Sequence, residues 1–132
     1  MNALTREIET CLSQLDVRGD GELSARFVFP PRFAGFSGHF PGNPVLPGVC
    51  MVQAALVMLQ AATRRPVSLQ RLVSAKWYAP VKPGDEIRFD GRTSPEDDLT
   101  LLLKARIACG ADKVADLALK VTLRDVVKDP AA

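Results

Sequence analysis

The sequence predicts an α+β fold in which a curved antiparallel sheet wraps around a long central apolar helix. Between Val49 and Ala62 only Gln53 and Gln60 interrupt a run of apolar residues, and such a helix has to be covered on every side. One strand-like segment precedes this run and four follow it, with turn signals between them. A sheet that curves around the helix is the simplest way to cover it.

Length and composition predict a single domain over residues 1–132. The chain has 132 residues, is 47% hydrophobic and carries a formal net charge of +2. Its basic residues are scattered among acidic ones, so we expect no nucleic-acid partner. The apolar run is shorter than the ~20 residues that span a bilayer, no apolar leader opens the sequence, and the three cysteines lack metal-like or paired spacing. We therefore expect a cytoplasmic protein with no membrane segment and no metal.

The elements on either side of the central helix follow from periodicity. Residues 3–15 have apolar residues at helical spacing and predict a short amphipathic helix, followed by a turn at 17–21. Alternation predicts a strand over Glu22–Phe29, and Arg64-Arg65-Pro66 ends the central helix. Four more strands are predicted, with turns at 82–85 and 109–112 and a loop at 93–98 between them: Leu69–Val81, Glu86–Arg92, Leu99–Ala108 and Lys113–Leu123.

The segment before the central helix predicts a site for a carbonyl compound. Residues 40–47 contain three prolines and cannot be helical, so they form a stiff segment that carries His39, the only histidine, toward the helix. Gly48 stands at the helix start, where a free N–H can bind an anion or a carbonyl oxygen. An imidazole, this N–H and the amide of Gln53 could act together on one carbonyl group.

Two sequence blocks carry a resemblance to a known family. Residues 38–49 (GHFPGNPVLPGV), with Gln53-Ala54 after them, resemble the signature of the bacterial 3-hydroxyacyl-[acyl-carrier-protein] dehydratases of the hot-dog fold. Residues 76–85 (KWYAPVKPGD) resemble the strand and turn that follow in that family. The resemblance implies the hot-dog fold. It also implies dehydration of a 3-hydroxyacyl thioester to the trans-2-enoyl thioester, without a cofactor, in fatty-acid or polyketide and polyene-type biosynthesis.

The resemblance also implies residue roles. His39 would remove the α-proton of the thioester, and the Gly48 N–H would polarise its carbonyl. The family places a carboxylate fourteen residues after this histidine, and Gln53 occupies that position here. An amide can donate a hydrogen bond to the departing hydroxyl but cannot transfer a proton to it. Four further residues are expected to bind substrate: Phe40, Pro47, Val49 and Trp77.

The expected partners are an acyl thioester and a second subunit. The thioester would be linked to acyl carrier protein or to CoA. Family members are homodimers whose site takes the histidine from one subunit and the acid from the other. This implies a homodimer, a larger assembly of dimers, or a heterodimer with an acid-bearing paralogue that completes the site with His39.

Gln53 keeps two other functions open. One is a non-catalytic or partner-completed subunit that binds acyl thioesters. The other is an acyl thioesterase, which ranks last because it also uses a helix carboxylate.

Other conspicuous residues have structural interpretations. Cys50 is expected to be a small core residue, although the first turn of a helix favours a thiolate. Asp85 and Asp112 are expected to form turns. Trp77 and Tyr78 are expected in the core and at an interface, where one of them could also line an acyl tunnel.

Overall fold

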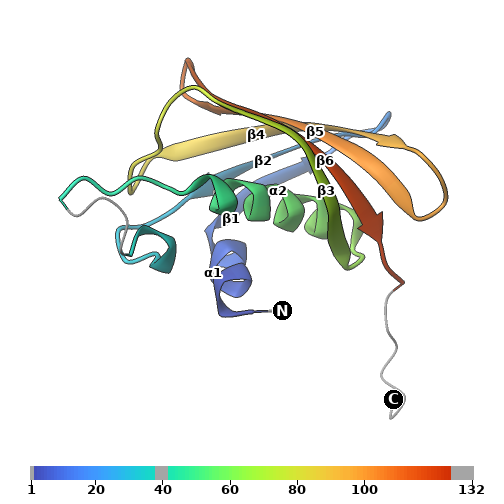
Figure 1. Cartoon of the computed structure of the whole chain (residues 1–132), viewed down its shortest axis with the longest axis horizontal. Helices are drawn as coiled ribbons and strands as arrows, with labels where there is room; N and C mark the ends of the chain where they lie inside the picture. The colour runs from blue at the N-terminus through green and yellow to red at the C-terminus, as the bar shows by residue number, and fades with distance from the viewer. Residues whose placement is uncertain (1, 38–41, 126–132) are drawn as a thin grey trace, which may run out of the picture.

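The computed structural model describes residues 2–37 and 42–125, which form a curved six-stranded antiparallel sheet in the order β1-β2-β4-β5-β6-β3. Helix α2 lies against the inner face of this sheet, as Figure 1 shows, and the predicted α+β arrangement is confirmed. The elements are α1 (Ala3–Cys11), β1 (Leu12–Val17), β2 (Glu22–Val28), a 3-10 turn (Ala34–Phe36), α2 (Gly48–Thr63), β3 (Val67–Trp77), β4 (Glu86–Pro95), β5 (Thr100–Cys109) and β6 (Asp112–Leu123).

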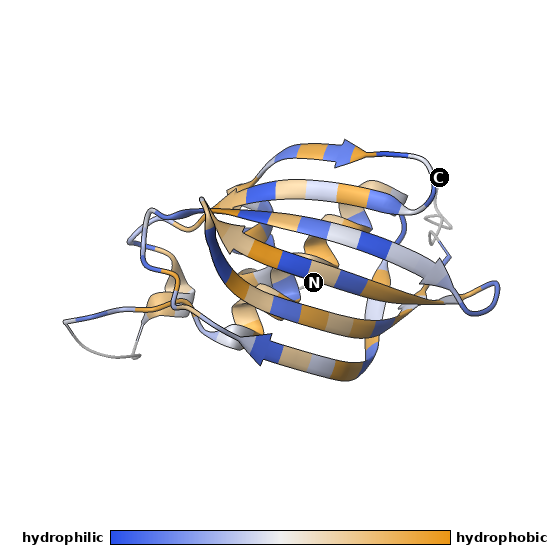
Figure 2. Cartoon of the chain, turned by 90° about the horizontal axis from the view of Figure 1, so that it is seen from above, coloured by the Kyte–Doolittle hydropathy of each residue, from blue (hydrophilic) through white to orange (hydrophobic). Residues whose placement is uncertain are grey.

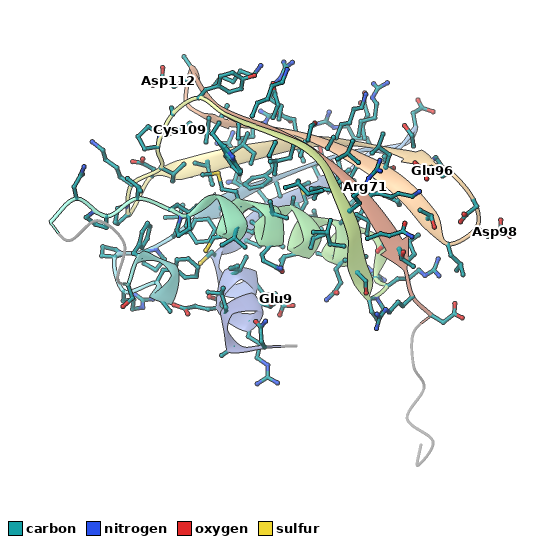
Figure 3. All side chains as sticks on the ribbon, viewed as in Figure 1. Glu9, Arg71, Glu96, Asp98, Cys109 and Asp112 are labelled. Carbon is teal, nitrogen blue, oxygen red and sulfur yellow. The ribbon has the colours of Figure 1, made fainter. Side chains whose placement is uncertain are left out.

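The core lies between α2 and the inner face of the sheet. Met58 is fully buried on the sheet side of α2, and a Cβ built on Gly91 of β4 would lie 3.2 Å from its Cε atom. Gly91 therefore permits the close approach of helix and sheet. The alternation that predicts a strand over Glu22–Phe29 puts Leu23, Ala25, Phe27 and Phe29 on one face, and all four are buried, although β2 ends at Val28. Figure 3 shows the side chains that fill the space between the two layers.

The sequence predicts that the central helix is covered on every side, and for the chain alone this prediction is wrong. Val49 is 63% exposed, and Gln53 and Gln60 are half-buried. These three residues lie on one strip of the helix, since their spacings of four and seven residues are close to whole helical turns. The sheet covers one side of α2 and α1 packs against another, which leaves this strip open.

The predicted helix over 3–15 is correct only to Cys11. Asn2 caps α1 by accepting a hydrogen bond from the Thr5 N–H at 2.8 Å, but from Leu12 the chain is strand β1. β1 pairs with β2 from Leu12 opposite Phe27 onward, with a bulge around Gln14, whose φ is 51°. Apolar residues at 12 and 15 fit a helical period equally well, and the backbone groups of β2 decide for a strand.

The remaining strands and turns agree with the predictions apart from their ends. β3 ends at Trp77 rather than at Val81, and β4 runs to Pro95, into the predicted loop. At the turn before β4, an Asp85 carboxylate oxygen accepts a hydrogen bond from the Lys82 N–H at 2.9 Å, as expected of a turn former. Asp112 directly follows the β5–β6 turn, where Gly110 has a φ of 58°.

The outer face of the sheet is polar. Figure 2 shows hydrophilic residues alternating with hydrophobic ones along the strands, which is the pattern of a sheet with one buried face. Within residues 2–37 and 42–125, strand β3 is one edge of the sheet and pairs only with β6, while β1 is the other edge.

Candidate substrate pocket at the start of the central helix

The first turn of α2 begins directly after a proline segment, as the sequence predicts. Pro47 precedes the helix with extended backbone angles (φ −62°, ψ 146°), and no side chain of the described residues caps it. The Leu46 N–H donates to the Val81 carbonyl at 2.8 Å, which ties this segment to the chain that follows β3. The first N–H groups of a helix have no partner within the helix, so a bound carbonyl oxygen can accept from them.

Trp77, the last residue of β3, lies directly against this first turn. A Cβ built on Gly48 would be 2.8 Å from the indole Cζ2 atom and 3.0 Å from Cη2. Beside the contact is a pocket of about 390 Å³. It is lined by Val45, Leu46, Gly48, Met51, Trp77, Tyr78, Ala79 and Pro80.

Tyr78 anchors the strand end that forms one side of the pocket. Its N–H donates to the Val114 carbonyl at 2.8 Å, and its hydroxyl donates to an Asp116 carboxylate oxygen at 3.2 Å. The Lys113 ammonium lies 2.7 Å from Asp116 and 4.7 Å from the centroid of the Tyr78 ring. The hydrogen bond from Lys113 lowers the pKa of Asp116, and the same bond raises the pKa of Lys113. Both groups therefore stay charged around neutral pH and hold the phenol in place.

The structure brings some of the predicted site residues together and separates others. Gly48 and Trp77 share the pocket, but Val49 does not line it and is largely exposed. Pro47 is half-buried directly before the helix and does not line the pocket either. Gln53 follows Gly48 by five residues, roughly 140° around the helix, so it lies on another side of α2. His39 and Phe40 lie outside the described residues, and their predicted roles stay predictions.

Sequence reasoning missed most of the pocket wall. Leu46 and Met51 are buried, and nothing in the sequence distinguishes them from other core residues. Trp77 and Tyr78 are expected in the core and at an interface, but Tyr78 is 51% exposed in this chain. Trp77 is 47% exposed, so neither aromatic residue belongs to the core of the chain alone.

The first helical turn does not activate Cys50. Its side chain is buried, and this burial raises the pKa of the thiol. Cys50 is therefore a neutral core residue, in agreement with the sequence interpretation. The described residues contain no cluster of three or more His, Cys, Asp or Glu side chains that could hold a metal ion.

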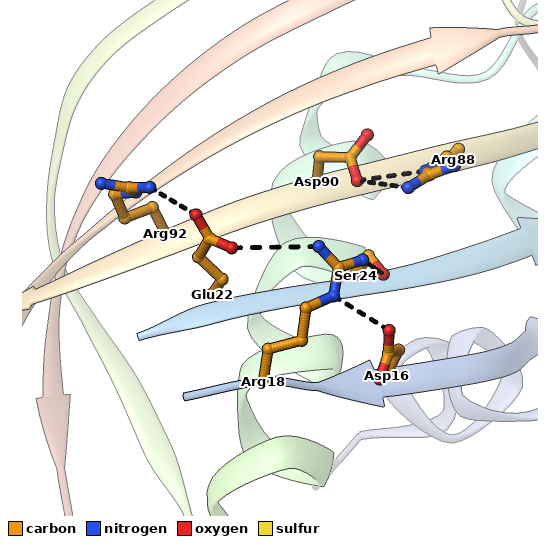
Figure 4. Close-up of polar contacts among 7 residues, drawn as sticks. All are labelled: Asp16, Arg18, Glu22, Ser24, Arg88, Asp90 and Arg92. Carbon is orange, nitrogen blue, oxygen red and sulfur yellow. Dashed lines mark hydrogen bonds and ion pairs between the residues drawn. The ribbon is translucent and has the colours of Figure 1, made fainter. Parts of the chain in front are cut away.

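A larger hollow, about 740 Å³, lies on the outer face of the sheet and is lined mainly by charged side chains. Figure 4 shows that many of these charges are paired along the strands, which makes the face a solvated ion-pair surface rather than a basic patch. The contacts drawn include Arg18 with Asp16 at 3.0 Å and with Glu22 at 3.9 Å, Arg92 with Glu22, and Arg88 with Asp90 at 3.0 Å.

Similarity to known proteins points to one family. The sequence profile of the ApeI-like family, ApeI dehydratase, matches residues 16–114, about three quarters of the chain. The chain is 45% identical over 60 residues to the 3-hydroxyacyl-[acyl-carrier-protein] dehydratase FabZ of Brucella melitensis biotype 2, covering 39% of this chain and 38% of that protein. It is 43% identical over 67 residues to the FabZ of Geotalea uraniireducens, covering 44% and 46%. These matches span less than half of each relative.

The fold has close structural counterparts. The dehydratase heterocomplex ApeI:P from Xenorhabdus doucetiae superposes with a TM-score of 0.73 at 20% identity, covering 84% of this chain and 96% of that chain. This likeness shows that the fold is the expected hot-dog fold. No helix of the described residues is long and apolar enough to cross a membrane.

Proposed function

Because the chain belongs to the ApeI-like dehydratase family, we propose that it removes water from a 3-hydroxyacyl thioester to give the trans-2-enoyl thioester. The observation that carries the proposal is the family match over residues 16–114, which contains both sequence blocks of the dehydratase signature. The thioester carrier in this proposal is acyl carrier protein or CoA. In support, the FabZ relatives are named for acyl-carrier-protein substrates.

The reaction needs three groups, and two are assigned to this chain. His39 takes the proton from C2, because an imidazole exchanges protons near neutral pH. The N–H of Gly48 stabilises the oxygen of the enolate that forms from the thioester carbonyl. The third group must protonate the 3-hydroxyl as it leaves, and Gln53 cannot supply that proton.

A second hot-dog subunit is proposed to complete the site. Gln53 lies on the open strip of α2 rather than in the pocket beside Gly48, so the acid position of one chain can serve the pocket of another. Strand β3 offers an 11-residue edge with exposed Leu69, Leu72 and Val73, and such an edge accepts another strand. The solved ApeI:P assembly is a dehydratase heterocomplex, which supports pairing with a second, different subunit. Pairing of two copies would place Gln53 at both sites.

The alternative of a non-catalytic subunit that only binds acyl thioesters is favoured by one observation. Such a subunit transfers no proton at position 53, so the amide of Gln53 is a residue that it can have there. The thioesterase alternative has no such support, because the helix carboxylate it needs is also absent at this position.

The experiment is a dehydration assay of the purified chain on 3-hydroxybutyryl-CoA, with hydrolysis of the thioester followed in parallel. The chain is tested alone and after co-expression with an acid-bearing paralogue. We expect enoyl product, and His39→Ala should abolish it while the circular dichroism spectrum stays unchanged. Equal turnover by His39→Ala would show that His39 is not the base, and hydrolysis without enoyl product would support the thioesterase instead.

A further inference from the structure

We infer that Trp77 is a positioning residue of the site, whose indole holds the first turn of α2 in place while its free side forms the wall against which the acyl thioester lies. The identification of the ligand as an acyl thioester rests on the proposed function. The contact between Trp77 and Gly48 and the pocket beside it are observed in the structure and do not depend on that proposal.

The contact explains why residue 48 is a glycine. Gly48 is in α2 and its φ is not in the left-handed region, so backbone freedom does not require a glycine there. The requirement is space, because an added Cβ would come within 2.8, 3.0 and 3.2 Å of three indole carbons. The indole therefore touches the backbone of the helix start directly, and the two residues form a matched pair.

The indole is fixed from behind by its own strand. Trp77 pairs with Ala115 of β6, and the next residue donates its N–H to the Val114 carbonyl. The hydroxyl of Tyr78 adds a bond to Asp116. Because the strand end is held at the backbone and at the next side chain, the backbone of Trp77 cannot retreat when a group is added at position 48, and the indole itself has to move.

The other side of the indole is open. Trp77 stays 47% exposed although it lies against the helix, and it lines the pocket together with Val45, Met51 and Pro80. A volume of about 390 Å³ is within the range of small-molecule pockets. An apolar wall beside the free N–H groups of a helix start suits a ligand with a carbonyl at one end and an apolar chain next to it. An acyl thioester has this chemistry.

The contact can be tested without any activity, because Trp77 is the only tryptophan of the chain. In Gly48→Ala the methyl group must displace the indole, so the emission should move to longer wavelength and acrylamide quenching should increase. Gly19→Ala is the matched control, since nothing lies within 4 Å of a Cβ at that position. Unchanged fluorescence in folded Gly48→Ala would overturn the inference. If Gly48→Ala does not fold, the double variant Gly48→Ala/Trp77→Ala should fold, because the indole that the methyl group would meet is gone. A double variant that also fails to fold would overturn the inference.

The positioning role is tested by kinetics on 3-hydroxybutyryl-CoA. Trp77→Phe should keep kcat/KM within a few-fold, and Trp77→Ala should lose on the order of 10²-fold, the scale of a misplaced catalytic group. Gly48→Ala should lower kcat/KM strongly in the natural background and much less in the Trp77→Ala background, because the clash is then gone. Additive effects would show that the two residues act independently and would contradict the inference.

A titration with hexanoyl-CoA separates this inference from the proposed function, since that thioester has no 3-hydroxyl and cannot be dehydrated. If the chain dehydrates its substrate but hexanoyl-CoA leaves the Trp77 emission unchanged, the inference fails and the dehydratase stands. If no dehydration occurs with any partner but hexanoyl-CoA changes the emission, the proposed reaction fails and the role of Trp77 in binding stands. Neither turnover nor a change in emission would refute both.

Discussion

In the proposed dehydratase reaction, Gln53 stands where the proton donor is needed. It occupies the position where the dehydratase signature has a carboxylate, and it lies half-buried on the open strip of α2. An amide at this position can still form hydrogen bonds, but unlike a carboxylic acid it has no proton that it can transfer to the leaving hydroxyl. Under the proposed function, this one functional group determines whether the protein needs a partner that carries an acid.

We predict that Gln53→Glu raises dehydration of 3-hydroxybutyryl-CoA by the purified protein, without any paralogue, by one or more orders of magnitude, because in a pair of copies each glutamate would serve the pocket of the other subunit. Positioned proton transfer is worth ~10²–10⁴-fold, and an apolar surrounding raises the pKa of a carboxyl group toward the value a general acid needs. Stability should fall modestly, because an ionised carboxylate is harder to bury than an amide.

Gln60→Glu is the control for this variant, since Gln60 lies on the same strip of α2 two turns later. It should leave activity unchanged. If the natural protein already dehydrates 3-hydroxybutyryl-CoA as fast as Gln53→Glu, another group supplies the proton. The amide of Gln53 then does not limit the reaction.

Asp97 gives a second prediction at the scale of one residue. In the β4–β5 loop its carboxylate accepts hydrogen bonds from the N–H groups of Leu99 at 2.9 Å and Thr100 at 2.8 Å. These bonds, first of all the one from Leu99, lower the pKa of Asp97. A lowered folded-state pKa contributes stability above the ordinary aspartate value of about 3.9, and this contribution is lost as pH falls through the folded-state pKa.

Asp97→Ala should therefore be less stable than the natural protein at neutral pH, and the difference should shrink at acidic pH. Urea melts from pH 7 downward measure it. Asp98→Ala, in the same loop, is the control and should lower stability at pH 7 less than Asp97→Ala does. If the stability difference between Asp97→Ala and the natural protein does not change with pH, the charge of the Asp97 carboxylate does not contribute to stability.

At the scale of elements, α2 holds the fold together through the side that faces the sheet. Met58 is fully buried there, against the gap that Gly91 leaves in β4, while Val49 on the same helix is exposed. An apolar residue of α2 thus contributes to stability only where it lies on the side of the helix that is buried against the sheet.

We predict that Met58→Ala lowers the free energy of unfolding by about 2–5 kcal/mol, the range for truncation of a buried methionine. Val49→Ala, which removes methyl groups from the side that is exposed in the chain alone, should lower it by less than Met58→Ala does. Thermal and urea unfolding would measure both variants. Similar losses for the two would mean that Val49 is covered in solution, which would itself reveal a partner on the open strip.

At the scale of the whole molecule, the two edges of the sheet differ. β1 has only six residues, whereas β3 has 11 residues with several exposed apolar side chains, although its pairing with β6 has two irregularities. Short edges resist pairing, and long apolar edges invite it. The β3 edge also ends at Trp77, so a subunit paired there lies near the pocket.

We predict that the protein is a dimer in dilute light scattering and that Leu72→Lys, on β3, converts it to a monomer. Leu72 is 46% exposed in the chain alone, and a lysine there would put a charge into the pairing surface. Val17→Lys is the matched control, because Val17 is 55% exposed on the β1 edge and its substitution should leave the dimer intact. A monomeric natural protein, or a dimer broken only by Val17→Lys, would contradict pairing through β3.

Local patterns determined much of this protein. The apolar run before Arg64 specifies a long helix, alternation specifies the inward side of β2, and the turns at Gly84 and Gly110 follow from residues that adopt positive φ. The family and the place of Gly48 at a helix start were also readable, because the two sequence blocks are contiguous. All of these features depend on neighbours within a few residues.

Only the tertiary structure decided the rest. Leu12–Val17 fits a helical period and is a strand because β2 offers it backbone partners. β3 follows α2 in the chain but lies beside β6, at the sheet edge, which makes Trp77 meet Gly48. The open strip with Gln53 exists because the sheet covers one side of the helix only. Each of these depends on pairing between segments far apart in the chain, and periodicity within a segment carries no information about its partner.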